Sequence, residues 1–362
     1  MFGIIDRYLG RAILSTSVLV LLTLVALAAI FGFVSELEDV GTGRYTVVKA
    51  AQYVLLTVPG MAYLLFSPAV LLGSLLGLGT LASNSELTVM RAAGVSIGRI
   101  IRSVLVTGLV LMAIVAVLGE VVMPRTERHA EQIRIAALDE RLSLGGDAGL
   151  WVRNGPRYIN ITTVMPDFTL LGLEVHEFVD GSLQRAIAAS RAMLVDGEWW
   201  LEDVATTVLD DRRAQVSRND RVLWSRVIDT PGATLVDAAV LEGLSISPES
   251  LSIVALWAQI GYLDDNALDS AAIRLAFWVK LTAPLATLVM LMLSLPFVFG
   301  SQRSGGAGQK IFIGIMLGIV YVLVNRLLTE LGLARGLSPM LSAFAPLLLF
   351  AALAVAGIRR IA

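Results

Sequence analysis

The chain has 362 residues, of which 56% are hydrophobic and only 16% are charged, and its mean hydropathy is +0.77. This composition is too apolar for an ordinary soluble domain or a disordered chain, so we expect an integral membrane protein. A net charge of -2 offers no basic surface for nucleic acid, and the absence of cysteine excludes disulfides and thiolate metal sites. The two histidines, His129 and His176, are far apart in the sequence, which argues against a histidine-based metal or catalytic site.

The first expected membrane span is the charge-free run of 23 residues from Ala12 to Val34, which follows a short amphipathic segment carrying Arg7 and Arg11. About 20 apolar residues suffice to cross a bilayer. The A-x-A triplet at 26–28 resembles a signal-peptide cleavage site, but the apolar run continues past it, so we interpret this segment as an uncleaved helix.

A second span is expected from about Tyr53 to Ala82, with kinks expected at Pro59 and Pro68. Gly73 and Gly77 form a G-x-x-x-G pattern in it. Small residues at this spacing permit close packing of helices in lipid, although glycine is also common in spanning helices that do not use such a face.

A short polar and basic segment at about residues 83–94 separates the second span from the third. Ser83 and Glu86 have the S-x-x-E spacing of a capping box, and Gly94 can adopt the left-handed conformation that ends a helix. A helix this short cannot cross a bilayer, so we expect it at the membrane surface, where a second protein can dock. Its cap, its apolar face and its flanking charges supply the expected docking residues: Ser83, Glu86, Leu87, Met90 and Arg91.

A third span is expected from Ile97 to Met123, ended by Pro124, and a helix near Thr126 to Leu142 then leaves the membrane. The chain stays polar to about Ser270. Short strand-like pieces in this insert, at 151–152, 158–161 and 199–201, alternate with the hairpin turn signals Asn154-Gly155, Asp180-Gly181 and Asp196-Gly197. This pattern predicts an all-β sandwich or barrel, followed by a helix from Pro248 to Tyr262 with Ser247 as its N-cap.

Three further spans are expected at Ile273–Phe299, Ile311–Leu331 and Leu337–Ile358. The predicted fold class is a polytopic α-helical membrane protein with six spans in a three-plus-three order and a large all-β domain between the third and the fourth. The expected division is 1–124 for the N-terminal membrane half, 125–271 for the β domain with its flanking helices, and 272–362 for the C-terminal membrane half.

The distribution of basic residues predicts the orientation, because short cytoplasmic loops carry an excess of lysine and arginine. With a cytoplasmic N-terminus, the outer short loops hold only Arg44, Lys49 and Arg335. The cytoplasmic side then holds nine basic residues, which are Arg7, Arg11, Arg91, Arg99, Arg102, Arg303, Lys310, Arg359 and Arg360. We therefore expect both termini and the 83–94 helix in the cytoplasm and the β domain outside, in the periplasm of a Gram-negative bacterium.

No motif of an enzyme is evident. The segment from Gly305 to Lys310 lacks the G-x-x-x-x-G-K-[ST] order of a nucleotide-binding loop, and the chain has no G-x-S-x-G or H-E-x-x-H motif. A cytoplasmic surface helix on a protein without its own ATPase is the arrangement expected of an ABC-transporter permease that is driven by a separate subunit.

Several segments together resemble the LptF/LptG permease family of the lipopolysaccharide exporter. They are Asp6-Arg7-Tyr8, the run 77–82 continuing through Ser85-Glu86-Leu87 and 90–94, Gly149-Leu150-Trp151, 244–247, and 297–300 with Arg303-Ser304. The resemblance covers the whole length, and its first and last segments favour the LptG branch over the LptF branch.

The resemblance implies half of a transporter that extracts lipopolysaccharide from the inner membrane. Its implied partners are an LptF-like permease, a dimer of an LptB-like ATPase, and periplasmic bridge proteins similar to LptC and LptA. This chain would bind no cofactor, because ATP and magnesium would be held by the ATPase. By resemblance, Glu86 would be important for coupling to the ATPase, the β domain would be a β-jellyroll, and the first and fifth spans would line lateral gates.

Lipopolysaccharide carries many acyl chains and phosphates, so its cavity needs apolar walls and a cationic rim at the outer interface. Basic residues expected near that level are Arg44, Lys49, Arg274, Lys280, Arg326 and Arg335, each of which can instead extend to the interface without a ligand. Arg326 lies four residues before Glu330, so the two share a helix face as an ion pair, a gate or a substrate contact. The candidate cavity or gate residues are Arg44, Lys49, Lys280, Arg326 and Glu330.

The outer end of the first span departs from the family. Some members carry lysines there, whereas this chain has Glu36, Glu38 and Asp39. These acids would repel phosphates unless they bind them through divalent cations or pair with basic groups of a neighbouring subunit, so we expect no phosphate site there. A different class of function, a membrane scaffold whose β domain docks periplasmic partners without transport, stays open, and a membrane enzyme is weaker because no catalytic set clusters.

Overall fold

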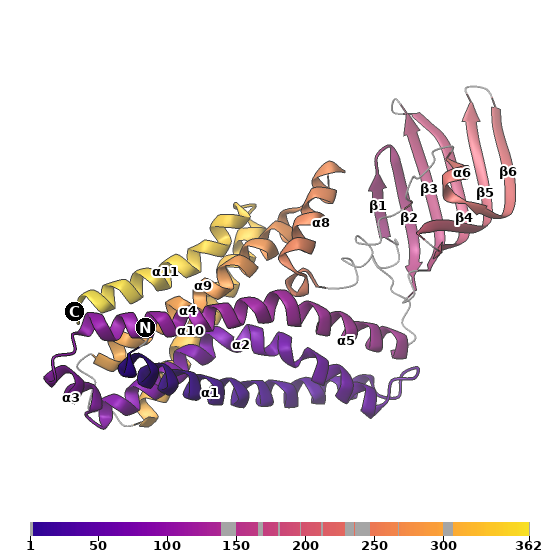
Figure 1. Cartoon of the computed structure of the whole chain (residues 1–362). Helices are drawn as coiled ribbons and strands as arrows, with labels where there is room; N and C mark the ends of the chain where they lie inside the picture. The colour runs from indigo at the N-terminus through magenta and orange to yellow at the C-terminus, as the bar shows by residue number, and fades with distance from the viewer. Residues whose placement is uncertain are drawn as a thin grey trace.

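The computed structural model describes residues 3–138, 150–165, 169–179, 182–195, 197–210, 213–228, 235, 247–266, 268–299 and 307–361. Long helices form an elongated bundle, and a β-sheet lies beyond one end of it (Figure 1). The short helix α3 (Glu86–Ala92) and both chain termini lie at the opposite end of the bundle. The sheet and α3 are therefore at opposite ends of the molecule.

All six predicted spans are helices long and apolar enough to cross a membrane. Their helices are α1 (Ile4–Glu36), α2 (Val47–Ser83), α4 (Ile97–Val117), α9 (Ala271–Phe299), α10 (Ala307–Ala334) and α11 (Pro339–Arg359). A sheet stands between the third and fourth spans. The three-plus-three order is thus confirmed.

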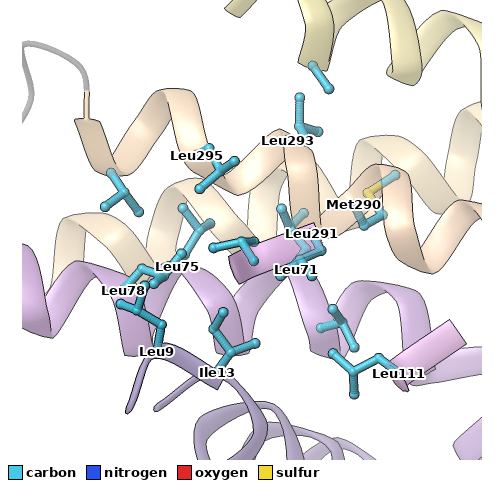
Figure 2. Packing of buried hydrophobic residues seen from close by; sticks show 14 of the residues in the cluster. Leu9, Ile13, Leu71, Leu75, Leu78, Leu111, Met290, Leu291, Leu293 and Leu295 are labelled. Atoms are coloured by element: carbon cyan, nitrogen blue, oxygen red, sulfur yellow. The ribbon is translucent and has the colours of Figure 1, made fainter. Parts of the chain in front are cut away.

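Buried aliphatic side chains hold the membrane bundle together (Figure 2). These side chains come from spans of both halves of the chain and include Leu9, Ile13, Leu71, Leu111 and Leu291. Burial of such side chains from lipid gains packing contacts rather than hydrophobic free energy, because lipid tails are as apolar as leucine. Close fit between the helices therefore determines their arrangement.

The G-x-x-x-G pair of α2 packs directly against α1. A Cβ atom on Gly73 would collide with the backbone of Ser17, and one on Gly77 would lie 2.7 Å from the carbonyl oxygen of Ala12. The hydroxyl of Thr16 donates to the carbonyl of Gly73 at 2.7 Å, which adds a polar contact across the same interface. The two glycines are thus a close-packing face and are not merely glycines of the kind common in spanning helices.

The third span does not end at Pro124. Helix α4 continues through a π-helical turn (Leu118–Val122) into α5 (Met123–Leu138). Pro124 is the second residue of α5, and in the first turn of a helix its missing N–H is not required. The prediction that proline ends the span was therefore wrong, and the helix expected near 126–142 continues the same helical path, with residues 139–142 outside the described part.

The insert contains a six-stranded antiparallel sheet whose strands pair in chain order. The strands are β1 (Leu150–Asn154), β2 (Arg157–Val164), β3 (Leu170–Val179), β4 (Ser182–Val195), β5 (Glu198–Asp210) and β6 (Arg213–Leu223). Gly155 and Gly197 have φ angles of +60° and +82°, as their hairpin turns require, whereas the turn at 180–181 lies outside the described residues. The all-β domain is confirmed, and its described strands form one up-and-down sheet.

The short helix α6 (Trp224–Val227) packs against the sheet. Trp224 is 1% exposed and packs with Ile159 and other buried residues of the strands. The domain therefore has a hydrophobic core of its own, separate from that of the membrane helices.

The helix that returns to the membrane begins later than predicted. A 3-10 turn (Pro248–Ser250) comes first, and α8 (Ile253–Asp265) follows after an extended residue. The cap is Ser252, whose hydroxyl accepts from the N–H of Ala255 at 3.2 Å, and not Ser247. Proline at the first position starts the 3-10 turn, but the extended backbone at Leu251 prevents that turn from continuing as the helix.

The C-terminal end of α8 contacts the edge of the sheet. The hydroxyl of Tyr262 donates to the carbonyl of Arg153 at 3.0 Å, and the N–H of Gly155 donates to the side-chain oxygen of Asn266 at 3.3 Å. Both contacts reach the β1–β2 hairpin. Helix α8 is therefore a connection between the sheet and the start of the fourth span.

Candidate functional site

Helix α3 is shorter than the sequence predicts, and its start differs. Ser83 is the last residue of α2, where its hydroxyl donates to the carbonyl of Thr80 at 2.9 Å. The residue before α3 is Ser85, which has a φ of +63° and makes no side-chain cap bond. The capping box expected from Ser83 and Glu86 is thus wrong, because α2 extends to Ser83. The predicted end is confirmed, since Gly94 has a φ of +91°.

The apolar side chains of α3 face the protein. Leu87 is 3% exposed and belongs to the membrane core, and Met90 is half-buried against that core. The exposed positions are Thr88, Val89, Arg91 and Ala92. The apolar face therefore anchors the helix to the bundle, and the opposite face, including Arg91, is the one available to a second protein.

Glu86 connects α3 to the first span. The hydroxyl of Tyr8 on α1 donates to the carboxylate of Glu86, with 2.5 Å between the oxygen atoms. A hydrogen bond to a carboxylate is stronger than one between neutral groups. No sequence spacing joins two residues 78 positions apart, and the D-R-Y segment indicated only a family resemblance.

Asp6 forms a second polar contact at the same end of α1. Its carboxylate accepts from the N–H of Gly3 at 2.8 Å and from the hydroxyl of Ser103, and it lies 3.9 Å from the guanidinium of Arg99. Ser103 and Arg99 belong to α4. The start of α1 is therefore attached both to α3, through Tyr8, and to α4, through Asp6.

The spans differ greatly in how much of their surface the rest of the chain covers. In the most apolar part of each span, 78% of residues are buried in α2, but only 11% are buried in α1 and 11% in α10. The first and fifth spans are thus the least covered of the six. Their apolar surfaces are open to lipid or to a second subunit.

Four of the five candidate cavity or gate residues lie at accessible positions. Arg44, Arg326 and Glu330 are exposed, and Lys49 is half-buried. Although Arg326 and Glu330 lie on one helix, no ion pair joins them among the contacts of the described residues. Arg326 and Glu330 are therefore open to another ligand or subunit, and their role stays a prediction.

Lys280 is different, because it is only 6% exposed. Its ammonium group donates to the carbonyl of Leu251, just before α8, and Glu120 is the carboxylate that acts on it electrostatically. Both carboxylate oxygens of Glu120 lie 3.0 Å from the N–H of Ile253, the first residue of α8. Glu120 was missed in the sequence, where it is a lone acid near the end of a span. The π-helical turn that contains it leaves no clear signal in composition.

Two of the three acids at the acidic end of the first span have partners within the chain. The guanidinium of Arg134 on α5 lies 2.7 Å from Asp39 and 3.4 Å from Glu36. The hydroxyl of Tyr45 also donates to Glu36 at 2.7 Å, and burial together with this bond raises the pKa of Tyr45 well above its usual range. Glu36 and Asp39 thus share the single positive charge of Arg134, and Glu38 is exposed.

Comparison with known proteins agrees with this architecture. Residues 7–360 match the family described as "Lipopolysaccharide export system permease LptF/LptG". The chain is 31% identical to the lipopolysaccharide export system permease protein LptG of Escherichia coli strain K12 over 348 residues, which is 95% of each chain. It is 32% identical to the protein of the same name from Haemophilus influenzae over 351 residues, covering 97% of this chain and 96% of the relative.

Proposed function

Because this chain belongs to the LptF/LptG family of lipopolysaccharide export system permeases, we propose that it is the LptG-like permease subunit of an ABC transporter. It extracts lipopolysaccharide from the inner membrane and passes it to a periplasmic bridge. An LptF-like permease is its partner in the membrane, and a separate LptB-like ATPase dimer supplies the energy. LptC-like and LptA-like proteins receive the lipid.

In this proposal the end of the bundle with α3 and both termini faces the cytoplasm, and the sheet faces the periplasm. The excess of arginine and lysine at the α3 end supports this orientation, as the positive-inside rule expects. The separation of α3 from the sheet along the bundle is also what transport across the membrane requires (Figure 1). ATP is hydrolysed at one end and lipid leaves near the other.

The observation that carries the proposal is the contact between Glu86 and Tyr8. A docking helix transmits force only if its displacement alters the position of a spanning helix. Leu87 anchors α3 to the membrane core, while the 2.5 Å bond from Tyr8 attaches it to α1. Movement of α3 by an ATPase therefore acts directly on α1.

The low coverage of α1 and α10 supports a lateral gate. A gate formed by the first span of one permease and the fifth span of the other needs two helices that their own subunit leaves open. These two helices are the least covered spans in this chain. Arg326 and Glu330, which do not pair with each other, supply charges on α10 that can meet the partner or the lipid phosphates.

The test is the variant Glu86→Ala in the reconstituted complex of the two permeases and the ATPase. Lipid released per ATP hydrolysed is expected to fall roughly tenfold, within the usual range of coupling free energies between sites. Before each assay the amount of co-purified ATPase is measured, because loss of the ATPase from Glu86→Ala also supports docking at α3.

The matched control is Glu249→Ala, which removes an exposed carboxylate from the other end of the molecule. It is expected to leave ATPase content and lipid release unchanged. Unchanged ATPase binding, hydrolysis and release in Glu86→Ala would refute coupling through α3 and favour the scaffold function.

A further inference from the structure

A groove of about 370 Å³ runs between α1 and α4 at the end of the bundle that carries α3. Most of its wall is apolar and is formed by side chains such as Leu14, Val106 and Val110. The two helices come close at Gly10, where a Cβ atom would lie 3.1 Å from the hydroxyl oxygen of Thr107. The volume is within the range of about 300–1,000 Å³ that small-molecule sites occupy.

Two arginines stand at the mouth of this groove. Arg7 and Arg11 are one helical turn apart on α1, and both are exposed and line the groove. Within the described part of the chain, neither has a carboxylate partner among the ion pairs. The one acid in the lining, Asp6, is already occupied by Gly3, Ser103 and Arg99. The mouth therefore carries uncompensated positive charge.

The position of the arginines along α1 places them at the level of lipid headgroups. Arg11 is the last charged residue before the charge-free run from Ala12 to Val34. This run of 23 residues is about 35 Å long at 1.5 Å per residue, which exceeds the hydrocarbon thickness of about 30 Å. Leu14 and Val110 consequently lie at the depth of acyl chains, and Arg7 and Arg11 lie at the interface.

We infer that this groove binds one anionic phospholipid, with an acyl chain along Leu14 and Val110 and its phosphate between Arg7 and Arg11. Basic pockets between spanning helices bind anionic headgroups, because each arginine near the surface attracts them. A free phosphate would use the arginines but leave the apolar wall empty. A zwitterionic phospholipid would fill the wall but carries no net charge for the two guanidinium groups.

This site is distinct from the proposed transport cavity. It lies at the end of the bundle opposite the sheet, where the substrate is not released (Figure 1). A lipid held between α1 and α4 would stabilise the part of α1 that carries Tyr8. The inference concerns lipid binding alone and requires neither lipid export nor ATP hydrolysis.

The experiment measures retention of phosphatidylglycerol by the purified permease complex, using native mass spectrometry after delipidation and addition of known lipid amounts. The double variant Arg7→Gln/Arg11→Gln is expected to retain phosphatidylglycerol roughly 30-fold more weakly than the wild type, because each interfacial arginine contributes about 1 kcal/mol. Phosphatidylethanolamine is expected to bind weakly to both. The matched control is Arg359→Gln/Arg360→Gln, which removes two exposed arginines near the C-terminus and is expected to retain phosphatidylglycerol like the wild type.

A second variant tests the apolar wall without altering charge. Val110→Trp fills the groove at an exposed position of α4 and is expected to reduce retention as well. Equal binding of the two lipids by the wild type, or equal losses in the arginine variant and its control, would overturn the site. Loss of the partner permease from the arginine variant, with normal phosphatidylglycerol retention, would assign the groove to a subunit instead.

Discussion

Two polar junctions hold the membrane helices at opposite ends, and they differ in burial. The inner junction is the bond between Tyr8 of α1 and Glu86 of α3, which is exposed to solvent. The outer junction consists of Glu120, Lys280 and the backbone on either side of the start of α8, and Lys280 in it is only 6% exposed. One end is thus joined by a solvated contact and the other by a buried one.

This difference determines what each junction can do. Breaking an exposed hydrogen bond exchanges it for bonds to water, so the inner junction can open and close at little cost. Separating buried polar groups leaves them unsatisfied, which costs much more. The inner junction suits a contact that links two moving helices without adding much stability, and the outer junction suits a fixed attachment of the β domain to the spans.

The largest effect is expected from Lys280→Met, which removes the buried ammonium group and retains most of the side-chain volume. The carbonyl of Leu251 and the carboxylate of Glu120 then lose their cation, and the complex should be destabilised by about 2–3 kcal/mol. Thermal unfolding in detergent measures the loss. Lys49→Met is the control, because Lys49 is more accessible and its side chain has no carboxylate partner among the described ion pairs. Equal unfolding temperatures for Lys280→Met and the wild type would show that the outer junction is not a fixed attachment.

A smaller effect is expected from Glu120→Leu. The first N–H of α8 loses both acceptor oxygens, and the helix start should be destabilised by about 1 kcal/mol. Amide hydrogen exchange at residues 253–256 should be faster than in the wild type. In Glu120→Gln, which keeps one acceptor oxygen, the exchange rate should lie between those of the wild type and Glu120→Leu. Glu38→Leu makes the same change at an exposed acid and should not alter exchange in α8. Identical exchange rates at residues 253–256 in Glu120→Leu, Glu120→Gln and Glu38→Leu would contradict a role for Glu120 at α8.

The sequence predicted features that depend on local pattern. Six apolar runs indicated six spans, and Gly94, Gly155 and Gly197 marked turns because only a residue without a side chain adopts positive φ freely. An error arose where one local signal is compatible with two structures. Pro124 was expected to end a span, but it occupies the first turn of α5, which tolerates proline.

The candidate site was less predictable than the fold. Glu86 was identified from its spacing to Ser83 and from the family resemblance, yet its partner Tyr8 is 78 positions away and no periodicity connects them. Leu87 and Met90 were expected on a docking face; Leu87 is buried in the membrane core and Met90 is half-buried against it, and their part in docking stays a prediction. Lys280 was expected at a lipid cavity, which stays a prediction; its bond to the carbonyl of Leu251 could not be predicted, because the two residues are 29 positions apart.

The smallest effect on stability is expected from Tyr8→Phe. This variant is also the sharpest test of the difference between the inner and the outer junction. This variant removes one exposed hydroxyl, so the unfolding temperature should equal that of the wild type. Lipid released per ATP hydrolysed should nevertheless fall several-fold, because α3 is no longer attached to α1. Tyr158→Phe removes an exposed hydroxyl from the sheet and should leave this ratio unchanged.

A double-mutant cycle then separates the effect of the Tyr8–Glu86 hydrogen bond from the separate effects of the two residues. If the hydrogen bond transmits the movement, Tyr8→Phe should add little to the loss already caused by Glu86→Ala, since that variant has no carboxylate to accept the bond. Additive losses would mean that each residue acts through a different partner, with Tyr8 outside the pathway from α3 to α1. A large drop in unfolding temperature for Tyr8→Phe would contradict the proposed difference between the two junctions. The inner junction would then be a structural attachment like the outer one.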